Sequence, residues 1–295
     1  MITHGQTIPR PPARVVLLGG GGFIGNAIQR RLLEHGIPVV APRSAELNLA
    51  GADAAKAIGE ILELTDVVVM LAAITPDKGR DIAATMRNVT MMQRVCEALE
   101  QSGCAHFVYF SSDAVYDPAT YQVKEDTPAS PRDLYGAMHL TRELMAKTLE
   151  AIPLLVIRPT IVYGQADTHN SYGPNRFRRT VECERKIILF GDGEELRDHI
   201  HVNDVAELTV RCLFQGSVGV LNIATGVSHT FREVAALFAK YSHAPIDIMA
   251  TQRTNPITHR RYDISNLHRA FPGFNFNSLE SGVAEMQALP GGDGK

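Results

Sequence analysis

Uniformly apolar runs alternate with stretches of helical period along the first half of this chain. The apolar runs are bounded by turn residues and cover 15–18, 37–41, 67–73, 106–110 and 154–157. Apolar residues recur at helical spacing in the stretches 26–35, 88–101 and 133–150. Runs that are apolar at every position predict strands buried on both faces, and their alternation with helices predicts a parallel sheet covered on both sides. We therefore expect an α/β protein with a doubly wound parallel sheet.

Beyond Gly164 this regularity weakens. An irregular segment rich in turn residues lies at 172–175, and a smaller C-terminal lobe is expected to begin there. A further helix is predicted at 205–214, with Asp204 as its N-cap. The chain contains no internal repeat, so we expect one larger domain with a smaller lobe attached to it.

The composition narrows the possible partners. With 295 residues and 45% apolar content, the chain can bury a large core. A net charge of -3 and a pI near 6.4 give no basic face for nucleic acid or an anionic membrane. No stretch has the length of a signal peptide or membrane span, so we expect a soluble, cytoplasmic protein. The cysteines are spaced too widely for a metal site and are expected to be reduced thiols: Cys96, Cys104, Cys183 and Cys212.

Four consecutive glycines join the first predicted strand to the first predicted helix. Gly20, Gly22 and Gly25 fit the spacing GxGxxG, while Gly19, Gly22 and Gly25 fit the wider GxxGxxG. Glycine lets the backbone approach a pyrophosphate, whose charge is met by free N–H groups at the helix N-terminus. Because a strand precedes this loop and a helix follows it, we predict a Rossmann-type dinucleotide site rather than a flexible turn.

The end of the second predicted strand indicates which dinucleotide binds. A carboxylate here accepts the ribose 2′-OH of NAD and repels the 2′-phosphate of NADP. The segment 40–44 contains no acid, and Arg43 and Ser44 can hold a phosphate through a guanidinium fork and a hydroxyl. NADP is therefore favoured over NAD. The alternative is that Arg43 is only a solvated side chain.

An ordered series of motifs carries a resemblance to a known family. The series comprises the glycine loop GGGGFIG at 19–25, LAA at 71–73, SSDAVY at 111–116, YG at 135–136, RP at 158–159, VYG at 162–164, GDG at 191–193, RD at 197–198 and HVNDVA at 201–206. It resembles the extended short-chain dehydrogenase/reductase family and, within it, the nucleotide-sugar epimerases, dehydratases and 4-keto reductases of the NAD-dependent epimerase/dehydratase type. The resemblance extends nearly from end to end and implies a smaller C-terminal lobe that binds substrate.

The resemblance also implies a set of cofactor contacts. The positions concerned are Gly19, Gly22, Phe23, Ile24, Gly25, Arg43, Asn48, Leu49, Leu71, Ala72, Ala73, Tyr135, His139 and Arg158. The stretch 43–49 is similar to the GDP-4-keto-sugar epimerase-reductases, and Ser112-Asp113 resembles the Thr-Asp pair of dTDP-4-keto-rhamnose reductases. Both groups typically use NADPH, which agrees with the charge argument at Arg43.

The predicted boundaries follow the same motifs. We expect a tail at 1–13, a dinucleotide-binding domain at 14–165 to which 200–226 return, a substrate-binding lobe from 166–199 and 227–289, and a tail at 290–295. The family usually dimerises through its two long helices. A homodimer is therefore expected, and the candidate contacts are Met91, Met92, Val95, Met138, Met145 and Leu149, although methionines at helical spacing are also ordinary core residues.

Hydride transfer at a sugar carbon requires a proton to move on or off the adjacent oxygen. In the family that this chain resembles, a Tyr is the acid/base and a Ser orients the reacting oxygen, and by motif position these are Tyr135 and Ser112. Asp113 follows Ser112 in the position where dehydratases commonly carry an acid, so elimination is a further possible reaction. Ser112 follows the predicted strand 106–110 at its carboxyl end, where open sheets bind ligands.

His139 departs from the family pattern, which has Lys four residues after the catalytic Tyr. A phenol with a pKa near 10 is a poor base at neutral pH, and a cation one helical turn away lowers that pKa. With an ordinary pKa of about 6.5, His139 is only partly protonated at pH 7 and gives smaller, pH-dependent assistance. It can still hydrogen-bond the nicotinamide ribose. We expect Arg142, two turns from Tyr135, to be solvated.

The substrate is implied by the C-terminal motifs. The family uses the Arg of the Arg-Asp pair, here Arg197, to hold a nucleotide diphosphate, and Asn175 is a second candidate contact. We therefore interpret the chain as an NAD(P)-dependent reductase or epimerase acting on a nucleotide-activated sugar. Three alternatives stay open: a dehydratase, a non-catalytic NAD(P)-binding sensor or partner protein, and a family member acting on a carbonyl substrate without a nucleotide.

Overall fold

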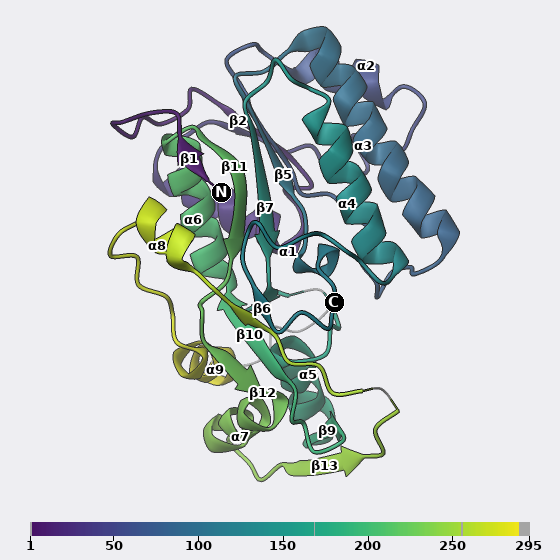
Figure 1. The fold of residues 1–295 in the computed structure, drawn as a ribbon, viewed down its shortest axis with the longest axis vertical. Coiled ribbons are helices and arrows are strands. Elements are labelled where there is room, and N and C mark those ends of the chain that lie inside the picture. Colours follow the sequence, from purple (N-terminus) through teal and green to yellow (C-terminus); the bar gives the residue numbers. More distant parts are fainter. Residues whose placement is uncertain (1, 168, 255, 289–295) are drawn as a thin grey trace.

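A seven-stranded sheet forms the centre of the computed structural model, which describes residues 2–167, 169–254 and 256–288. The strands lie in the order β1, β11, β7, β5, β4, β2, β3, and all neighbours are parallel except β1 and β11 (Figure 1). Their bounds are Thr3–His4 (β1), Val15–Leu18 (β2), Val39–Val40 (β3), Val67–Met70 (β4), His106–Phe110 (β5), Leu154–Pro159 (β7) and Ser217–Ile223 (β11). The predicted α/β fold is confirmed.

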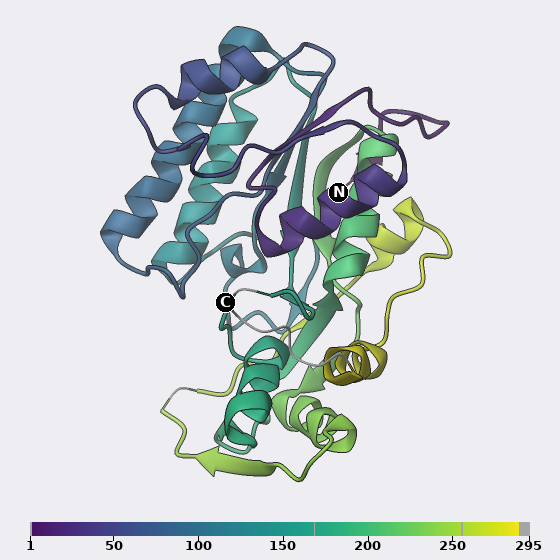
Figure 2. The same cartoon turned by 180° about the vertical axis from the view of Figure 1, so that it is seen from behind.

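Helices cover both faces of this sheet, as Figures 1 and 2 show from opposite sides. One layer contains α1 (Phe23–Glu34) and α6 (Val202–Phe214), and the other contains α2 (Ala54–Ile61), α3 (Ile82–Ser102) and α4 (Leu134–Lys147). Successive residues of a strand face opposite layers, so Val15 and Leu17 pack beneath α1 and α6 while Val16 and Leu18 pack beneath α2, α3 and α4. This explains why the central strands β2 and β4 are apolar at every position.

Two helix starts differ from the sequence prediction. Helix α3 begins at Ile82 instead of 88, because the Asp81 carboxylate caps it by accepting a hydrogen bond from the Ala84 N–H. The prediction of Asp204 as an N-cap is wrong. Helix α6 begins at Val202 with His201 as its cap, and the Asp204 carboxylate instead accepts hydrogen bonds from the backbone and side-chain nitrogens of Asn277.

The smaller lobe lies below the large sheet in Figure 1. Helices α5 (Pro174–Glu184), α7 (Phe231–Tyr241) and α9 (Leu279–Ala288) surround its core, which includes Phe177, Phe231 and Phe238. Its strands are β8 (Ile161–Tyr163), β10 (Leu196–His201) and β12 (Ser228–Thr230) in one sheet, and β9 (Lys186–Phe190) with β13 (Asp247–Thr251) in another.

Three short segments depart from the predicted division of the chain. Within the predicted tail 1–13, β1 extends the large sheet by pairing with β11. Helix α8 (Ser265–Ala270) packs its Leu267 into the larger core although it falls in the predicted substrate lobe. Strand β6 (Gln122–Val123) pairs with β14 (Arg261–Tyr262) and ties the C-terminal half to the loop after β5. The predicted tail 290–295 lies outside the described residues.

The residues considered for a dimer contact lie mostly inside the molecule. Met92, Val95, Met138 and Leu149 are buried beneath α3 and α4, so they serve the core of this chain. All four cysteines are free, and only Cys183 is exposed. In the part of the chain that the structure describes, no helix has the length and apolar character required to cross a bilayer.

A buried ion pair joins α4 to β7. Arg158 donates from Nε and Nη2 to the two carboxylate oxygens of Glu143 at 2.8 and 2.6 Å, and the Ser111 hydroxyl donates to the same carboxylate at 2.5 Å. The third guanidinium nitrogen of Arg158 donates to the Tyr116 hydroxyl at 2.9 Å, which in turn donates to Asn222. This network fixes α4 relative to β7, β11 and the segment that follows β5.

Glu143→Gln is expected to destabilise the fold strongly, because it leaves the Arg158 charge buried without its carboxylate. The expected loss in the free energy of unfolding is about 3–5 kcal/mol, measured by urea denaturation. Glu60→Gln is the control, because the pair of Glu60 with Lys56 is exposed and its removal should cause no measurable change. Equal effects of the two substitutions would contradict the structural role given to Glu143.

Candidate active site

The glycine loop forms a tight cradle between β2 and α1. Gly19 has a φ of +99°, and a Cβ there would lie 2.6 Å from the Ala72 nitrogen. A Cβ at Gly25 would lie 2.5 Å from the Gly19 carbonyl oxygen, so α1 can approach the loop only with glycine at this position. No described side chain caps α1, and its first turn contains no acid. The N–H groups of Phe23, Ile24 and Gly25 are therefore available to an anion.

The segment after β3 places Arg43 in solvent, with 80% of its side chain exposed. Its guanidinium is bonded to the Glu46 carboxylate, which also accepts from the Arg43 backbone N–H at 2.9 Å. The Asn48 side chain accepts a hydrogen bond from the Ala50 N–H within its own turn, and Leu49 is buried in the core. An acid that the strand-end pattern did not reveal therefore lies beside Arg43.

The segment Leu71-Ala72-Ala73 continues from β4 along the edge of the glycine loop. The N–H groups of Leu71 and Ala72 both donate to the Leu18 carbonyl, at 2.8 and 2.9 Å. This contact keeps the segment beside the predicted dinucleotide site. Arg158 is different, because each of its guanidinium nitrogens already has a protein partner. Its position therefore indicates a structural role rather than a cofactor contact.

Tyr135 lies in the first turn of α4. Asp133 caps this helix by accepting from the Gly136 N–H at 2.8 Å. A Cβ at Gly136 would collide with the Ala114 carbonyl oxygen in the 3-10 turn η1 (Asp113–Val115), so glycine is required for α4 to pack against the end of β5. This contact brings Tyr135 next to Ser112 and Asp113. A hollow of about 500 Å³ opens beside Tyr135, and Ile74, Asn88 and Met138 also line it.

The surroundings of Tyr135 oppose its ionisation. Burial, together with the negative charge of Asp113, raises the pKa of Tyr135 to about 12. The Arg142 guanidinium and a hydrogen bond from Ser112 lower this pKa in part. The Ser112 hydroxyl also accepts from the Ala114 N–H at 3.1 Å, which holds it at the start of η1. Tyr135 and Ser112 are thus adjacent, as the motif predicts, but the free phenol is strongly protonated.

His139 lies one turn after Tyr135 and is 2% exposed. The two rings meet edge to face with centroids 4.7 Å apart. Burial and the nearby Arg142 guanidinium hold the pKa of His139 well below its ordinary value, so the imidazole is neutral at physiological pH. The expectation of partial protonation at pH 7 is therefore wrong. Its cause is the position of the ring beneath the sheet edge, which the sequence does not reveal.

The tautomer of His139 follows from its hydrogen bond. Nδ1 lies 2.7 Å from the Tyr109 hydroxyl, for which it is the hydrogen-bond partner among the described residues. The buried phenol needs an acceptor for its proton, so Tyr109 donates to Nδ1 and Nε2 carries the imidazole proton. Nε2 is buried and has no partner among the described residues. It is a buried donor without an acceptor among the described residues.

Arg142 is fully buried, so the expectation that it is solvated is wrong. Its Nη2 donates to the Ala72 carbonyl at 3.0 Å, and its guanidinium lies 5.0 Å from the centroid of the Tyr109 ring. Neither contact could be predicted from helical spacing, because Tyr109 lies on β5 and Ala72 lies in the segment after β4.

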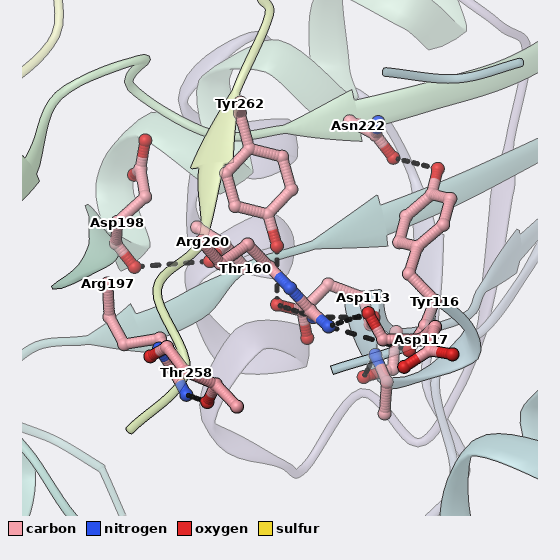
Figure 3. A network of polar contacts seen from close by, with 12 residues as sticks. Asp113, Tyr116, Asp117, Thr160, Arg197, Asp198, Asn222, Thr258, Arg260 and Tyr262 are labelled. Carbon is pink, nitrogen blue, oxygen red and sulfur yellow. Dashed lines mark hydrogen bonds and ion pairs between the residues drawn. The ribbon is translucent and has the colours of Figure 1, made fainter. Parts of the chain in front are cut away.

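Asp113 is held by the C-terminal half of the chain (Figure 3). The Tyr262 hydroxyl donates to its carboxylate at 2.6 Å, and Arg260 lies 3.4 Å from the same oxygen. Arg260 also donates to the backbone carbonyls of Asp113 and Asp117. The sequence analysis did not identify Arg260 or Tyr262, because no short motif links them to a residue nearly 150 positions earlier.

Arg197 extends from β10 toward the same region (Figure 3). It donates to the backbone and hydroxyl oxygens of Thr258, and no described carboxylate forms an ion pair with it. Burial and the positive charge of Arg260 lower the pKa of Arg197. Arg260 is paired with Asp113, whereas the partners of Arg197 are uncharged oxygens, so the Arg197 charge can accept an anion.

Asn175 is less available than predicted. Its side-chain oxygen accepts from the Gly164 N–H at 3.2 Å, and its nitrogen donates to the Val162 carbonyl at 3.0 Å. The residue is 2% exposed and fastens the start of α5 to β8. Its amide is therefore already used within the protein, which indicates a structural role rather than contact with substrate.

Comparisons with known proteins identify the family of this chain. The NAD dependent epimerase/dehydratase family model matches residues 15–224. A UDP-glucose 4-epimerase of Mycolicibacterium smegmatis is 29% identical over 261 residues, covering 79% of this chain and 83% of that protein. Two solved structures are also similar. RMD from Pseudomonas aeruginosa, complexed with NADPH, has a TM-score of 0.80 at 24% identity over 94% of this chain and 98% of that one.

MoeE5 in complex with UDP-glucose and NAD has a TM-score of 0.78 at 25% identity, covering 93% of this chain and 97% of that one. These relatives carry either form of the nicotinamide cofactor. The family match covers most of the large sheet, the glycine cradle, and the residues around Tyr135. The chain therefore belongs to the NAD-dependent epimerase/dehydratase family of extended short-chain dehydrogenases/reductases.

Proposed function

We propose that this chain is an NAD(P)-dependent reductase or epimerase that interconverts keto and hydroxyl forms of a nucleotide-activated sugar. The observation that carries this proposal is the position of Tyr135 and Ser112, at the same sheet edge as an uncapped glycine cradle. Arg197 and Arg260 face this edge from the smaller lobe and have a net positive charge. The glycine cradle fits a dinucleotide, and the two arginines fit a diphosphate-linked substrate.

The dinucleotide would be held at both ends of the sheet edge. Gly19, Gly22 and the first turn of α1 would take the pyrophosphate, and Nε2 of His139 would donate to the nicotinamide ribose. When bound, the nicotinamide gives or accepts the hydride. The unpartnered Nε2 proton and the close approach at Gly25 are the features of this chain that fit such a group.

Tyr135 would move the proton. In the reductive direction its hydroxyl donates to the sugar carbonyl oxygen while Ser112 donates a hydrogen bond to the same oxygen. The high pKa of Tyr135 suits this acid role, since the phenol is protonated throughout the physiological range. The reverse reaction needs the tyrosinate, so any group that stabilises this anion accelerates it.

Tyr135→Phe is expected to abolish turnover while preserving cofactor binding, because only the hydroxyl is lost. Steady-state hydride transfer with a panel of nucleotide sugars should fall by at least about 10²-fold, with an unchanged Kd for NADPH measured by fluorescence. Tyr121→Phe is the control, since that side chain is 51% exposed. Undiminished turnover in Tyr135→Phe would overturn the proposed acid/base.

NADP is favoured over NAD in this proposal because no acid ends β3 and Arg43 is exposed. Glu46 competes for the Arg43 guanidinium in the free protein, so binding of a 2′-phosphate must displace this exposed pair. The cost is small, because exposed ion pairs contribute little. The fold accommodates both cofactors, since RMD has NADPH bound and MoeE5 has NAD bound.

Arg43→Ala is expected to weaken NADPH binding by about 10- to 100-fold, the value of one charge-assisted hydrogen bond, and to leave NADH binding unchanged. Glu46→Gln should strengthen NADPH binding, since it frees Arg43. Arg87→Ala is the control, because Arg87 is exposed on α3, away from β3, and its removal should not change NADPH binding. Dissociation constants for the two cofactors measure the effect, and an equal change for both would argue against a 2′-phosphate contact.

Arg197→Ala is expected to raise KM for a nucleotide sugar by about 10- to 100-fold, because a charge-assisted bond to the diphosphate is lost. A simple carbonyl substrate should be unaffected. Arg176→Ala, at an exposed position of α5, is the matched control. If Arg197→Ala leaves KM unchanged while turnover persists, the substrate is a carbonyl or alcohol without a nucleotide.

A non-catalytic dinucleotide-binding protein is the second candidate function. The observation that favours it is the neutral His139 in a position where this chain's relatives are expected to have a cation. Tight cofactor binding without turnover on any nucleotide sugar would support this candidate. A dehydratase is less well supported, because Asp113 is already bound to Tyr262 and Arg260.

A further inference from the structure

Arg142 is a buried cation without an acidic partner. It has no exposed surface, and no carboxylate among the described residues forms an ion pair with it. Its nearest acidic neighbour along α4 is Glu143, which is fully used by Arg158 and Ser111. Nε has no hydrogen-bond partner among the described residues. A buried charge without a counter-ion is destabilising, so a function for this charge has to be sought in its surroundings.

The guanidinium points back along α4 toward Tyr135. Nη1 lies 3.9 Å from the Met138 sulfur, one turn before Arg142 in the helix. Helical side chains incline toward the N-terminus, and an arginine is long enough to span more than one turn. The charge therefore lies beneath His139, near the ring of Tyr109. Tyr109 also hydrogen-bonds His139, so this ring contacts both Arg142 and His139.

The charged groups that act most on Tyr135 come from η1 and from α4 with its N-cap. Asp113 of η1 and Asp133 at the start of α4 both disfavour the tyrosinate. Arg142 favours it from the buried side of α4. Two other cations lie farther out: Arg80 lines the hollow beside Tyr135, and Arg260 is already paired with Asp113. His139 cannot serve in this way, because it is neutral. Ser112 contributes a hydrogen bond but no charge.

We propose that Arg142 supplies the positive charge that stabilises the ionised form of Tyr135, in place of a lysine at position 139. Arg142 is then a positioning residue, acting through Tyr135 and not touching substrate. The inference rests on the proposed role of Tyr135, which it deepens. A guanidinium remains charged at every pH at which a protein is folded, so its assistance is constant where that of a histidine would vary.

The ionisation of residue 135 can be measured without substrate. A fluorinated tyrosine placed at this position ionises at lower pH than tyrosine, and its fluorine NMR signal reports the midpoint. Arg142→Gln and Arg142→Met should each raise this midpoint by about one pH unit, the effect of removing a charge at this range. Arg142→Lys should leave it nearly unchanged. Adding His139→Lys to Arg142→Gln should lower it again.

A structural role alone would give a different pattern. If Arg142 only fills space, its removal should lower the urea midpoint of unfolding and leave the fluorine titration midpoint unchanged. If Arg142 is an unpaired buried charge, Arg142→Met should not lower the urea midpoint of unfolding. An unchanged fluorine titration midpoint in a folded Arg142→Gln or Arg142→Met protein would overturn the inference. Failure of His139→Lys to restore the midpoint would do the same.

The outcome for catalysis is separate. If the inference holds, turnover in the oxidative direction by Arg142→Gln falls about tenfold at neutral pH and recovers as the pH rises. A midpoint that shifts in a protein without turnover on nucleotide sugars would support the charge effect and refute the proposed enzyme. If Tyr135→Phe loses turnover and the fluorine titration midpoint is unchanged in Arg142→Gln, the proposed enzyme is supported and the role of Arg142 is refuted.

Discussion

The absence of a side chain at Gly136 is the steric condition for the whole candidate site. Without it, α4 could not approach the Ala114 carbonyl, and Tyr135 would stand away from Ser112. The Asp133 cap and the Arg158–Glu143 pair hold the same helix at its start and along its buried face. Geometry at this sheet edge is therefore determined by packing, before any charge in the site is considered.

The two buried arginines near α4 illustrate different uses of charge. Arg158 is saturated by Glu143 and Tyr116 and serves as a structural link. Arg142 has a carbonyl, a sulfur and an aromatic ring as neighbours, which leave its charge unneutralised. An uncompensated charge in a medium of low dielectric acts over longer distances than a paired one. Its effect on a phenol more than one turn away is therefore physically reasonable.

Much of the fold could be predicted because the central strands of the parallel sheet are buried on both faces, which requires apolar residues at nearly every position. The glycine loop was equally informative, since Gly19 and Gly25 meet steric limits that only glycine satisfies. Helix starts were harder to predict. Asp204 has the residue type of a cap, yet its carboxylate is bound to Asn277 in the distant C-terminal segment.

The candidate site was predictable only where short motifs determine position, as for Ser112 and Tyr135. Partners remote in sequence escaped prediction, which is why Arg260 and Tyr262 at Asp113 were missed. The environment of a helix face was also invisible. The sequence could not show that Arg142 is buried. Nor could it show that the Tyr109 hydroxyl of β5 donates to Nδ1 of His139 and leaves Nε2 as the unpartnered nitrogen among the described residues.

A crystal structure of the protein with NADPH and a nucleotide sugar is the decisive measurement for this account. In that complex we expect the His139 Nε2 proton to contact the nicotinamide ribose. We expect the Tyr135 hydroxyl to face the reacting sugar carbon beside the nicotinamide ring. The diphosphate should lie against Arg197. A bound cofactor whose nicotinamide lies away from Tyr135, with Nε2 of His139 still unpaired, would contradict it.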